Sequence, residues 1–199
     1  MPLHSPRRSP VVALLALLLG LTVALIELDV IDYAFERVGV ESRYLISLLA
    51  ASLLGSGVNV PLTRRRDEAP QLSVNLGGAV IPTALSAYLL WQGAAVWQSL
   101  LAIALVAMVV HRLARPVAQV GITVPIVVPP LVAAGAALLL APSSAPAVAY
   151  VAGTLGTLIG ADLTNLALLR RLGGPQVSIG GAGTFDGIFV TGILAVMLA

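Results

Sequence analysis

Two aspartates in the C-terminal third of the chain are the residues whose type and setting could do chemistry. Asp162 lies in the apolar run GADLTNL, and Asp186 precedes the apolar run that closes the chain, behind the stretch GGAGTF. An acid inside a membrane-crossing segment is costly when charged and is a functional candidate by default. Two such carboxyls sharing a proton could activate a water for hydrolysis, whereas one that titrates could bind a proton or a cation.

Polar residues accompany both acids at what we expect to be the same depth. Asp162 lies eight residues before Arg170, roughly 12 Å along a helix, and Asp186 lies eight residues after Ser178. The residues that we predict to bind a substrate or an ion are Asn59, Asn75, Asn165, Thr184, Gly181 and Gly183. The alternative for each acid is a structural role, as an acceptor for backbone N–H groups or, for Asp186, as a helix cap.

The composition predicts an all-α integral membrane protein. The 199 residues are 58% hydrophobic and only 10% charged, with a mean hydropathy of +1.00, which is far more apolar than a soluble domain requires. Cysteine is absent, which excludes disulfides, thiolate metal sites and cysteine nucleophiles. Both histidines, His4 and His111, lie beside arginines at expected helix ends. We therefore predict no metal and no cofactor.

Apolar runs long enough to cross a bilayer give about seven transmembrane helices in a single domain. They span roughly 10–31, 43–62, 73–91, 95–111, 121–141, 145–168 and 183–198. With this count, nine of the eleven arginines fall on one side and two, Arg37 and Arg43, on the other. We therefore expect the protein in the cell inner (plasma) membrane. The positive-inside rule places its N-terminus in the cytoplasm and its C-terminus on the opposite side of the membrane. The basic start and the first apolar run are interpreted as an uncleaved first helix. The excess of basic residues is explained by the arginines on the cytoplasmic side of the membrane, so it does not indicate nucleic-acid binding.

Two stretches of the chain, 53–80 and 158–185, resemble each other. Asn59 and Arg64 recur 106 residues later as Asn165 and Arg170, and Pro70-Gln71 and Ser73 recur 105 residues later as Pro175-Gln176 and Ser178. This predicts parallel halves, about 10–91 and 121–198, joined by a linker helix at about 95–111. Parallel repeats of this kind occur in small transporters.

Helical spacing predicts how the polar and small residues are presented. Ser52, Gly55 and Asn59 would form one inward-facing stripe, and Gly156 and Gly160 have the spacing that permits close helix contact. Prolines within 121–141 predict a kink or a break in that helix.

Three sequence boxes resemble an uncharacterised prokaryotic family of multi-pass membrane proteins, a domain of unknown function. The boxes are SVNLGGAVIP (73–82), GADLTNL (160–166) and SIGGAGTFDGIF (178–189). The resemblance covers most of the chain and implies no established activity.

A looser resemblance is to the GxGD-type intramembrane aspartyl proteases. In that group one aspartate lies on the sixth helix and another near the cytoplasmic start of the seventh, which implies Asp162 and Asp186 as a catalytic dyad. The chain departs from the pattern, because GAGTFD replaces GxGD and Asp162 follows Gly-Ala rather than Tyr. The family's later Pro-Ala-Leu segment and two further helices have no counterpart.

Two functions from different classes follow from these residues. The first, which we rank slightly ahead, is an intramembrane aspartyl peptidase acting on a membrane peptide. The second is a proton- or cation-coupled transporter or channel for a small solute or ion. The expected surroundings are the lipid bilayer, with no nucleic acid, and a bundle this small is a candidate homodimer.

Overall fold

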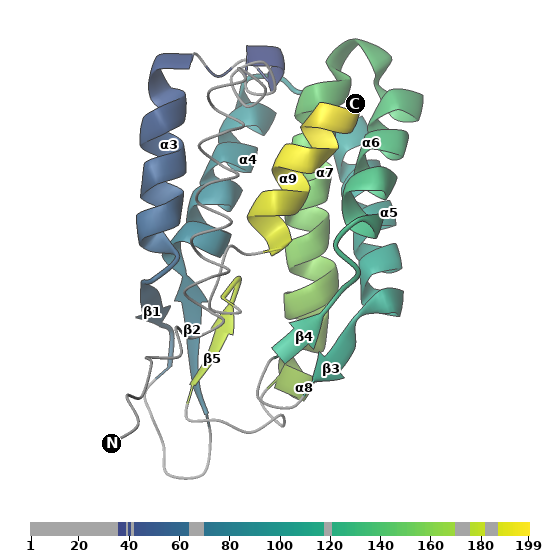
Figure 1. The fold of residues 1–199 in the computed structure, drawn as a ribbon. Coiled ribbons are helices and arrows are strands. Elements are labelled where there is room, and N and C mark those ends of the chain that lie inside the picture. The colour runs from purple at the N-terminus through teal and green to yellow at the C-terminus, as the bar shows by residue number, and fades with distance from the viewer. Residues whose placement is uncertain are drawn as a thin grey trace, which may run out of the picture.

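The computed structural model describes residues 36–38, 40, 42–63, 70–117, 121–169, 176–181 and 187–199. Long helices lie side by side and short strands gather at one end of them (Figure 1). The α-helices are α3 (Ser42–Gly55), α4 (Ile81–Trp91), α5 (Val96–Leu113), α6 (Val128–Leu140), α7 (Ala145–Thr157), α8 (Leu166–Leu169) and α9 (Gly187–Leu198). The strands are β1 (Asn59–Pro61), β2 (Gln71–Asn75), β3 (Arg115–Val117), β4 (Gly121–Thr123) and β5 (Gln176–Ile179).

The fold is mostly helical, as the composition predicts. Two helical stretches of the described chain are long and apolar enough to cross a membrane, Val96–Leu113 and Pro142–Leu168. They correspond to the expected helices 95–111 and 145–168. Three further apolar helices are shorter, namely Leu76–Trp91, Val128–Leu140 and Gly187–Leu198. The expected first helix, 10–31, lies outside the described residues.

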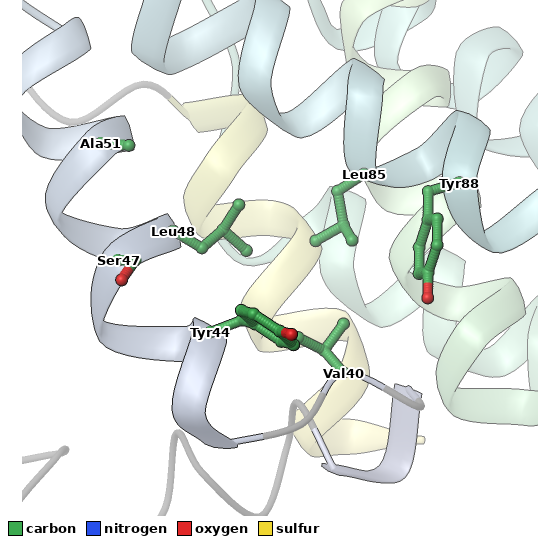
Figure 2. A pocket seen from close by; sticks show the side chains of 7 residues that line it. All are labelled: Val40, Tyr44, Ser47, Leu48, Ala51, Leu85 and Tyr88. Carbon is green, nitrogen blue, oxygen red and sulfur yellow. The ribbon is translucent and has the colours of Figure 1, made fainter.

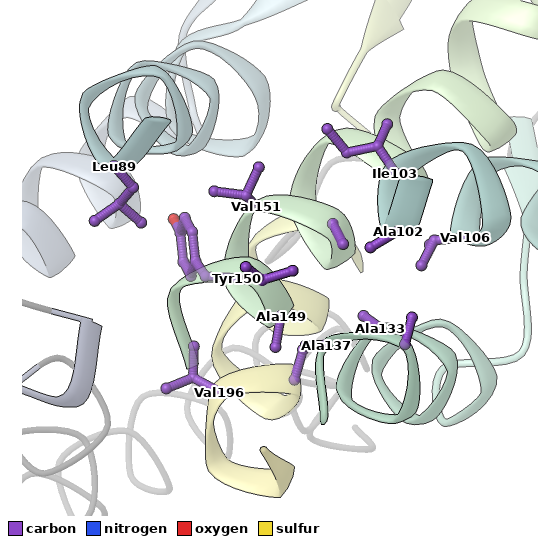
Figure 3. Close-up of a cluster of buried hydrophobic side chains, with 14 of the residues drawn as sticks. Leu89, Ala102, Ile103, Val106, Ala133, Ala137, Ala149, Tyr150, Val151 and Val196 are labelled. Atoms are coloured by element: carbon purple, nitrogen blue, oxygen red, sulfur yellow. The ribbon is translucent and has the colours of Figure 1, made fainter. Parts of the chain in front are cut away.

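Helix α7 is the centre of the bundle and packs against α4, α5, α6 and α9. Its side chains Ala149, Tyr150 and Val151 are almost fully buried. The side chains that enclose them in Figure 3 are Leu89 of α4, Ala102, Ile103 and Val106 of α5, Ala133 and Ala137 of α6, and Val196 of α9. Alanine and valine predominate because small side chains let neighbouring helices approach closely.

The predicted contact at Gly156 and Gly160 is confirmed. A Cβ added at Gly156 would lie 2.6 Å from the Cβ of Val106, and one at Gly160 would lie 2.5 Å from the carbonyl oxygen of Ala107. Both glycines therefore face α5, whose own backbone occupies the space that a side chain would need. The expected linker helix is thus packed tightly on α7.

The strands correct the expectation that 43–62, 73–91 and 121–141 are continuous helices. Helix α3 ends at Gly55 because Ser56-Gly57 turns the chain, and β1 follows. In QLSVN the apolar residues alternate with polar ones, a period of two that suits a strand. The prolines of 121–141 mark a helix start rather than a kink, because Pro129 and Pro130 occupy the first turn of α6, where proline is tolerated.

The three-stranded sheet joins segments that are far apart in the sequence. Its order is β1-β2-β5, with β1 antiparallel and β5 parallel to β2. The register places Gln71 opposite Gln176 and Ser73 opposite Ser178. The two similar sequence stretches therefore lie side by side through hydrogen-bonded backbone.

Two π-helical turns flank this sheet: η1 (Leu76–Val80) leads from β2 into α4, and η3 (Leu158–Asp162) continues α7. A short 3-10 turn (Leu163–Asn165) then leads into α8, and another (Pro142–Ser144) precedes α7. Turns of the π type are rare and are frequent at functional sites. Asp162 is the last residue of η3, so the predicted acid lies where the helical geometry changes.

Candidate functional site

The carboxyl group of Asp162 reaches from the end of η3 to the chain that follows β5. Its Oδ2 accepts a hydrogen bond from the backbone N–H of Gly180 at 2.7 Å. Gly180 has a φ of +66°, and a Cβ there would lie 2.5 Å from the Cβ of Ala79 in η1. A glycine is required on both grounds. Gly180 is consequently held between the two π-helical turns, with Asp162 on one side and Ala79 on the other.

Three other polar side chains form a hydrogen-bonded group on the sheet beside this junction. Asn59 Oδ1 accepts from Asn75 Nδ2 at 3.1 Å and from Ser178 Oγ at 2.5 Å. Gly181 packs on the same group, because a Cβ there would lie 2.5 Å from Ser178 Oγ and 3.1 Å from Asn59 Oδ1. Three of the predicted site residues, Asn59, Asn75 and Gly181, therefore lie in one group. Ser178, which was not predicted, belongs to the same group.

Asn75 is almost fully buried, and both polar atoms of its side chain are hydrogen-bonded. Besides its bond to Asn59, its Nδ2 donates to the carbonyl oxygen of Ser56 at 2.7 Å, and its Oδ1 accepts from the backbone N–H of Gly78 at 2.7 Å. Asn75 therefore caps η1 and ties it to the end of α3. These hydrogen bonds give Asn75 a structural role where α3, β2 and η1 meet.

Asn59 is in a strand, not on a helical stripe with Ser52. Ser52 instead donates its hydroxyl to the carbonyl oxygen of Gly77 at 2.6 Å, inside the contact between α3 and η1. A Cβ at Gly77 would lie only 1.9 Å from the carbonyl oxygen of Ser52. The inward stripe is therefore wrong beyond Gly55, because the chain leaves the helix there.

Asn165 does not join the group around Asn59. Its Nδ2 donates to the carbonyl oxygens of Gly160 at 3.0 Å and Ala161 at 2.9 Å, within its own helical segment. Thr164 likewise donates to Gly160 O at 2.8 Å and contacts His111 Nδ1 at 2.9 Å. These side chains bond backbone carbonyls near η3. Asn59 and Asn165 occupy matching places in the two similar stretches but have different hydrogen-bond partners, and that each binds a substrate or an ion stays a prediction.

Asp186, Thr184 and Gly183 lie outside the described residues. The chain on both sides of them is described, and it contacts the elements around Asp162. On one side, Gly180 bonds Asp162. On the other, Ile188 of α9 is buried in an apolar cluster with Leu158 of η3 and Ile179 of β5.

A cavity of about 520 Å³ lies elsewhere, between α3 and α4 (Figure 2). It is lined by Val40, Tyr44, Ser47, Leu48, Ala51, Leu85 and Tyr88. These residues lie toward the ends of α3 and α4 that are remote from the sheet, so the cavity includes none of the predicted site residues. Among the described residues, no three His, Asp or Glu side chains gather into a set that could hold a metal ion.

Ser178 is the residue of this site that sequence reasoning did not select. Its position in the repeated Pro-Gln-x-Ser segment was the available signal, since Ser73 occupies the matching place. Ser73 is fully buried and donates to the carbonyl oxygen of Val177 at 3.1 Å.

Comparison with known protein families assigns the chain to one of them. Residues 21–198 match the family described as "Protein of unknown function (DUF1614)". The chain belongs to the DUF1614 family. No curated protein and no solved structure matches it. The expected membership in an uncharacterised family is confirmed, while the likeness to aspartyl proteases stays a prediction.

Proposed function

We propose that this DUF1614 protein is a multi-pass membrane protein that binds a proton or a small monovalent cation at Asp162 and couples that binding to transport of a small solute or ion. We place it in the inner (plasma) membrane with its N-terminus in the cytoplasm. The long apolar helices Val96–Leu113 and Pro142–Leu168 and the arginine asymmetry support this placement.

The observation that carries the proposal is the position of the Asp162 carboxyl. It lies in the longer of the two apolar helices, at the end of a π-helical turn, and bonds the backbone of Gly180. Irregular backbone at membrane depth occurs where it is buried in protein or lines a cavity. In many transporters, broken helices at the interface between repeats bind the coupling ion. The parallel pairing of β2 with β5 supports such an interface here.

The hydrogen bond between Asp162 and Gly180 supplies a coupling step. A carboxylate accepts a hydrogen bond from an N–H more strongly than a neutral carboxyl does. Binding a proton or a cation at Asp162 therefore weakens its hold on Gly180. Because Gly180 is wedged against Ala79, release of the glycine changes the contact between the two π-helical turns. The binding event is thereby transmitted to both halves of the molecule.

Flux measurements in proteoliposomes test this proposal. The purified protein is reconstituted with a pH-sensitive dye inside, and proton or Na⁺ gradients are imposed. Asp162→Asn should abolish gradient-driven flux, since the amide neither releases a proton nor carries a charge. Asn165→Ala, whose hydrogen bonds are local, is the matched control and should retain flux. Equal flux in wild type and Asp162→Asn would refute the proposal.

An intramembrane aspartyl peptidase is the second candidate. It is favoured by the packing of Gly180 and Ile188, which brings both flanks of the segment containing Asp186 to the elements around Asp162. In this alternative, one carboxyl acts as base and the other as acid toward a shared water. Cleavage of a transmembrane peptide that is lost in both Asp162→Asn and Asp186→Asn would establish it. Carboxyls far apart on different faces would exclude it.

A further inference from the structure

Helix α5 meets the segment around Asp162 in a constant register. Ala107 of α5 lies against Gly160 of η3, where an added Cβ would come within 2.5 Å of the carbonyl oxygen of Ala107. One helical turn further along both segments, His111 Nδ1 lies 2.9 Å from Thr164 Oγ1. Both pairs are 53 residues apart in the sequence, so the register is kept where the helical geometry changes. Asp162 therefore lies between two points at which its segment contacts α5.

The hydrogen bonds of Thr164 determine which nitrogen of His111 carries a proton. A carbonyl oxygen only accepts, so the 2.8 Å bond from Thr164 Oγ1 to the carbonyl oxygen of Gly160 uses the single hydroxyl hydrogen of Thr164. Thr164 Oγ1 in turn accepts from Asn165 Nδ2 at 3.3 Å. Toward His111 the hydroxyl oxygen can only accept, so the ring Nδ1 must donate. A neutral His111 is consequently in the Nδ1–H tautomer, which its hydrogen bond selects.

His111 ties an irregular segment to a regular helix. Helix α5 is regular from Val96 to Leu113, whereas the chain through Asp162 passes from a π turn to a 3-10 turn within 158–165. The other side-chain hydrogen bonds of Thr164 and Asn165 stay within residues 160–165. Among the described residues, the bond from His111 is the one that joins these side chains to a different helix.

We infer that His111 is a positioning residue for Asp162: its Nδ1–H holds Thr164, and with it the chain just after the acid, against α5. The contact at Gly160 fixes the chain two residues before Asp162, and the bond to Thr164 fixes it two residues after. The carboxyl is thereby held where it accepts the N–H of Gly180 at 2.7 Å. This inference rests on the proposed function for its effect on binding at Asp162, whereas the tautomer of His111 does not.

Nitrogen NMR of the purified full-length protein tests the tautomer without any ligand. The chain contains two histidines, so His4→Gln protein with isotope-labelled histidine gives a signal from His111 alone. At about pH 8.5, where an ordinary histidine is neutral, Nδ1 should be the protonated nitrogen and Nε2 the unprotonated one. An Nε2–H tautomer would overturn the inference.

Two variants of Thr164 separate its hydroxyl from its size. Thr164→Val keeps nearly the same shape but removes the acceptor, so the ring should no longer be confined to the Nδ1–H tautomer. Thr164→Ser keeps the hydroxyl, and the Nδ1–H tautomer should remain. Thr164 is exposed, so neither change should unfold the protein. An unchanged tautomer in Thr164→Val would show that Thr164 does not fix the ring, and the inference would fail.

Two variants of His111 test the effect on binding at Asp162. In His111→Asn the amide nitrogen is attached to Cγ, as Nδ1 is, so a donor is kept, whereas His111→Leu has a similar size and no donor. The readout is the concentration of monovalent cation, or of protons, that gives a fixed rise in melting temperature, because this concentration scales with Kd. His111→Leu should require about threefold to tenfold more, as loss of one net hydrogen bond would, and His111→Asn should stay within about twofold of the wild type.

The outcomes distinguish this inference from the proposed function. Equal responses of His111→Asn and His111→Leu would overturn the positioning role, because a role of the ring in packing alone does not depend on a donor. A wild type that responds to neither cation nor pH would instead overturn the proposed function, and with it the effect on binding, while the NMR result would still decide the tautomer.

Discussion

Two π-helical turns of the described chain, η1 and η3, resemble each other in backbone but differ in the polar side chain beside each. At η1 the side chain is that of Asn75, which is neutral and bonds Ser56, Asn59 and Gly78 at once. At η3 it is that of Asp162, whose carboxyl bonds the N–H of Gly180 on another element. The first turn is fixed by an amide that has a single state. The second is held by a group that can gain or lose a charge.

This difference indicates that the two turns hold their surroundings in different ways; we call the contacts of η1 the first junction and those of η3 the second. Asn75 is buried and its bonds keep α3, β2 and η1 together regardless of the solution. Asp162 is only partly buried, and its hydrogen bond joins η3 to the chain after β5. We therefore expect variants at the first junction to affect mainly folding and variants at the second to affect mainly binding.

The largest effect should come from Gly77→Ala, which breaks the first junction. The added methyl would lie 1.9 Å from the carbonyl oxygen of Ser52 and 2.4 Å from the backbone nitrogen of Ser56. Neither backbone atom can move without unwinding α3, so we expect a loss of more than about 3 kcal/mol in unfolding free energy. Chemical denaturation monitored by circular dichroism measures it.

Gly135→Ala is the matched control for that prediction. Gly135 lies within α6, and beyond the adjacent residues and backbone of its own helix no described atom lies within 4 Å of an added Cβ. The variant should be neutral or should gain up to about 1 kcal/mol, as glycine-to-alanine changes inside helices do. A comparable loss at both positions would contradict the assignment of Gly77 to a close contact.

Asn75→Ala should have the next largest effect. It leaves the carbonyl oxygen of Ser56 and the N–H of Gly78 without their partner in a buried place. Unsatisfied buried groups cost about 1–3 kcal/mol each, and we expect a total loss of about 2–4 kcal/mol in the same denaturation experiment. A loss below 1 kcal/mol would show that Asn75 is not the structural residue of this comparison.

Asp162→Asn should change stability less, by about 1 kcal/mol, because the amide oxygen can still accept from Gly180 with a weaker bond. Binding should be affected far more. The variant should lose any shift in melting temperature caused by Na⁺, K⁺ or Li⁺ at constant ionic strength. If Asp162→Asn destabilised the protein as much as Asn75→Ala, the two junctions would not differ as proposed.

The smallest effect should come from Asn165→Ala, at about 0.5–1.5 kcal/mol. Its bonds to Gly160 and Ala161 lie within its own helical segment, and the side chain is only partly buried. Cation-dependent melting should be retained. A loss of that response in Asn165→Ala, with folding intact, would place this amide in the binding site after all.

The apolar helices and their close contacts could be predicted from the sequence, because both depend on local composition and spacing. The runs around 96–113 and 142–168 are apolar throughout, and Gly156 and Gly160 carry the spacing of a tight helix contact. Membership in a family of unknown function was also expected from the sequence, and the family match confirms it.

The sheet and the π-helical turns could not be predicted in the same way. Ser73 and Ser178 were aligned as similar residues, but their pairing in parallel strands depends on backbone contacts between distant segments. The turn η1 is likewise tied to a distant segment, because Asn75 beside it donates to the carbonyl oxygen of Ser56. Asn165 bonds nearby carbonyls, a local arrangement that sequence spacing does not distinguish from a place in a binding site.

The measurement that tests the central claim most directly is the melting temperature of purified wild type and Asp162→Asn across a series of monovalent cations and a series of pH values. A ligand that binds the folded protein raises its stability in proportion to occupancy. The account predicts a shift in at least one series for the wild type and none in that series for Asp162→Asn. Equal shifts in both proteins, or a wild type that responds to neither cation nor pH, would contradict it.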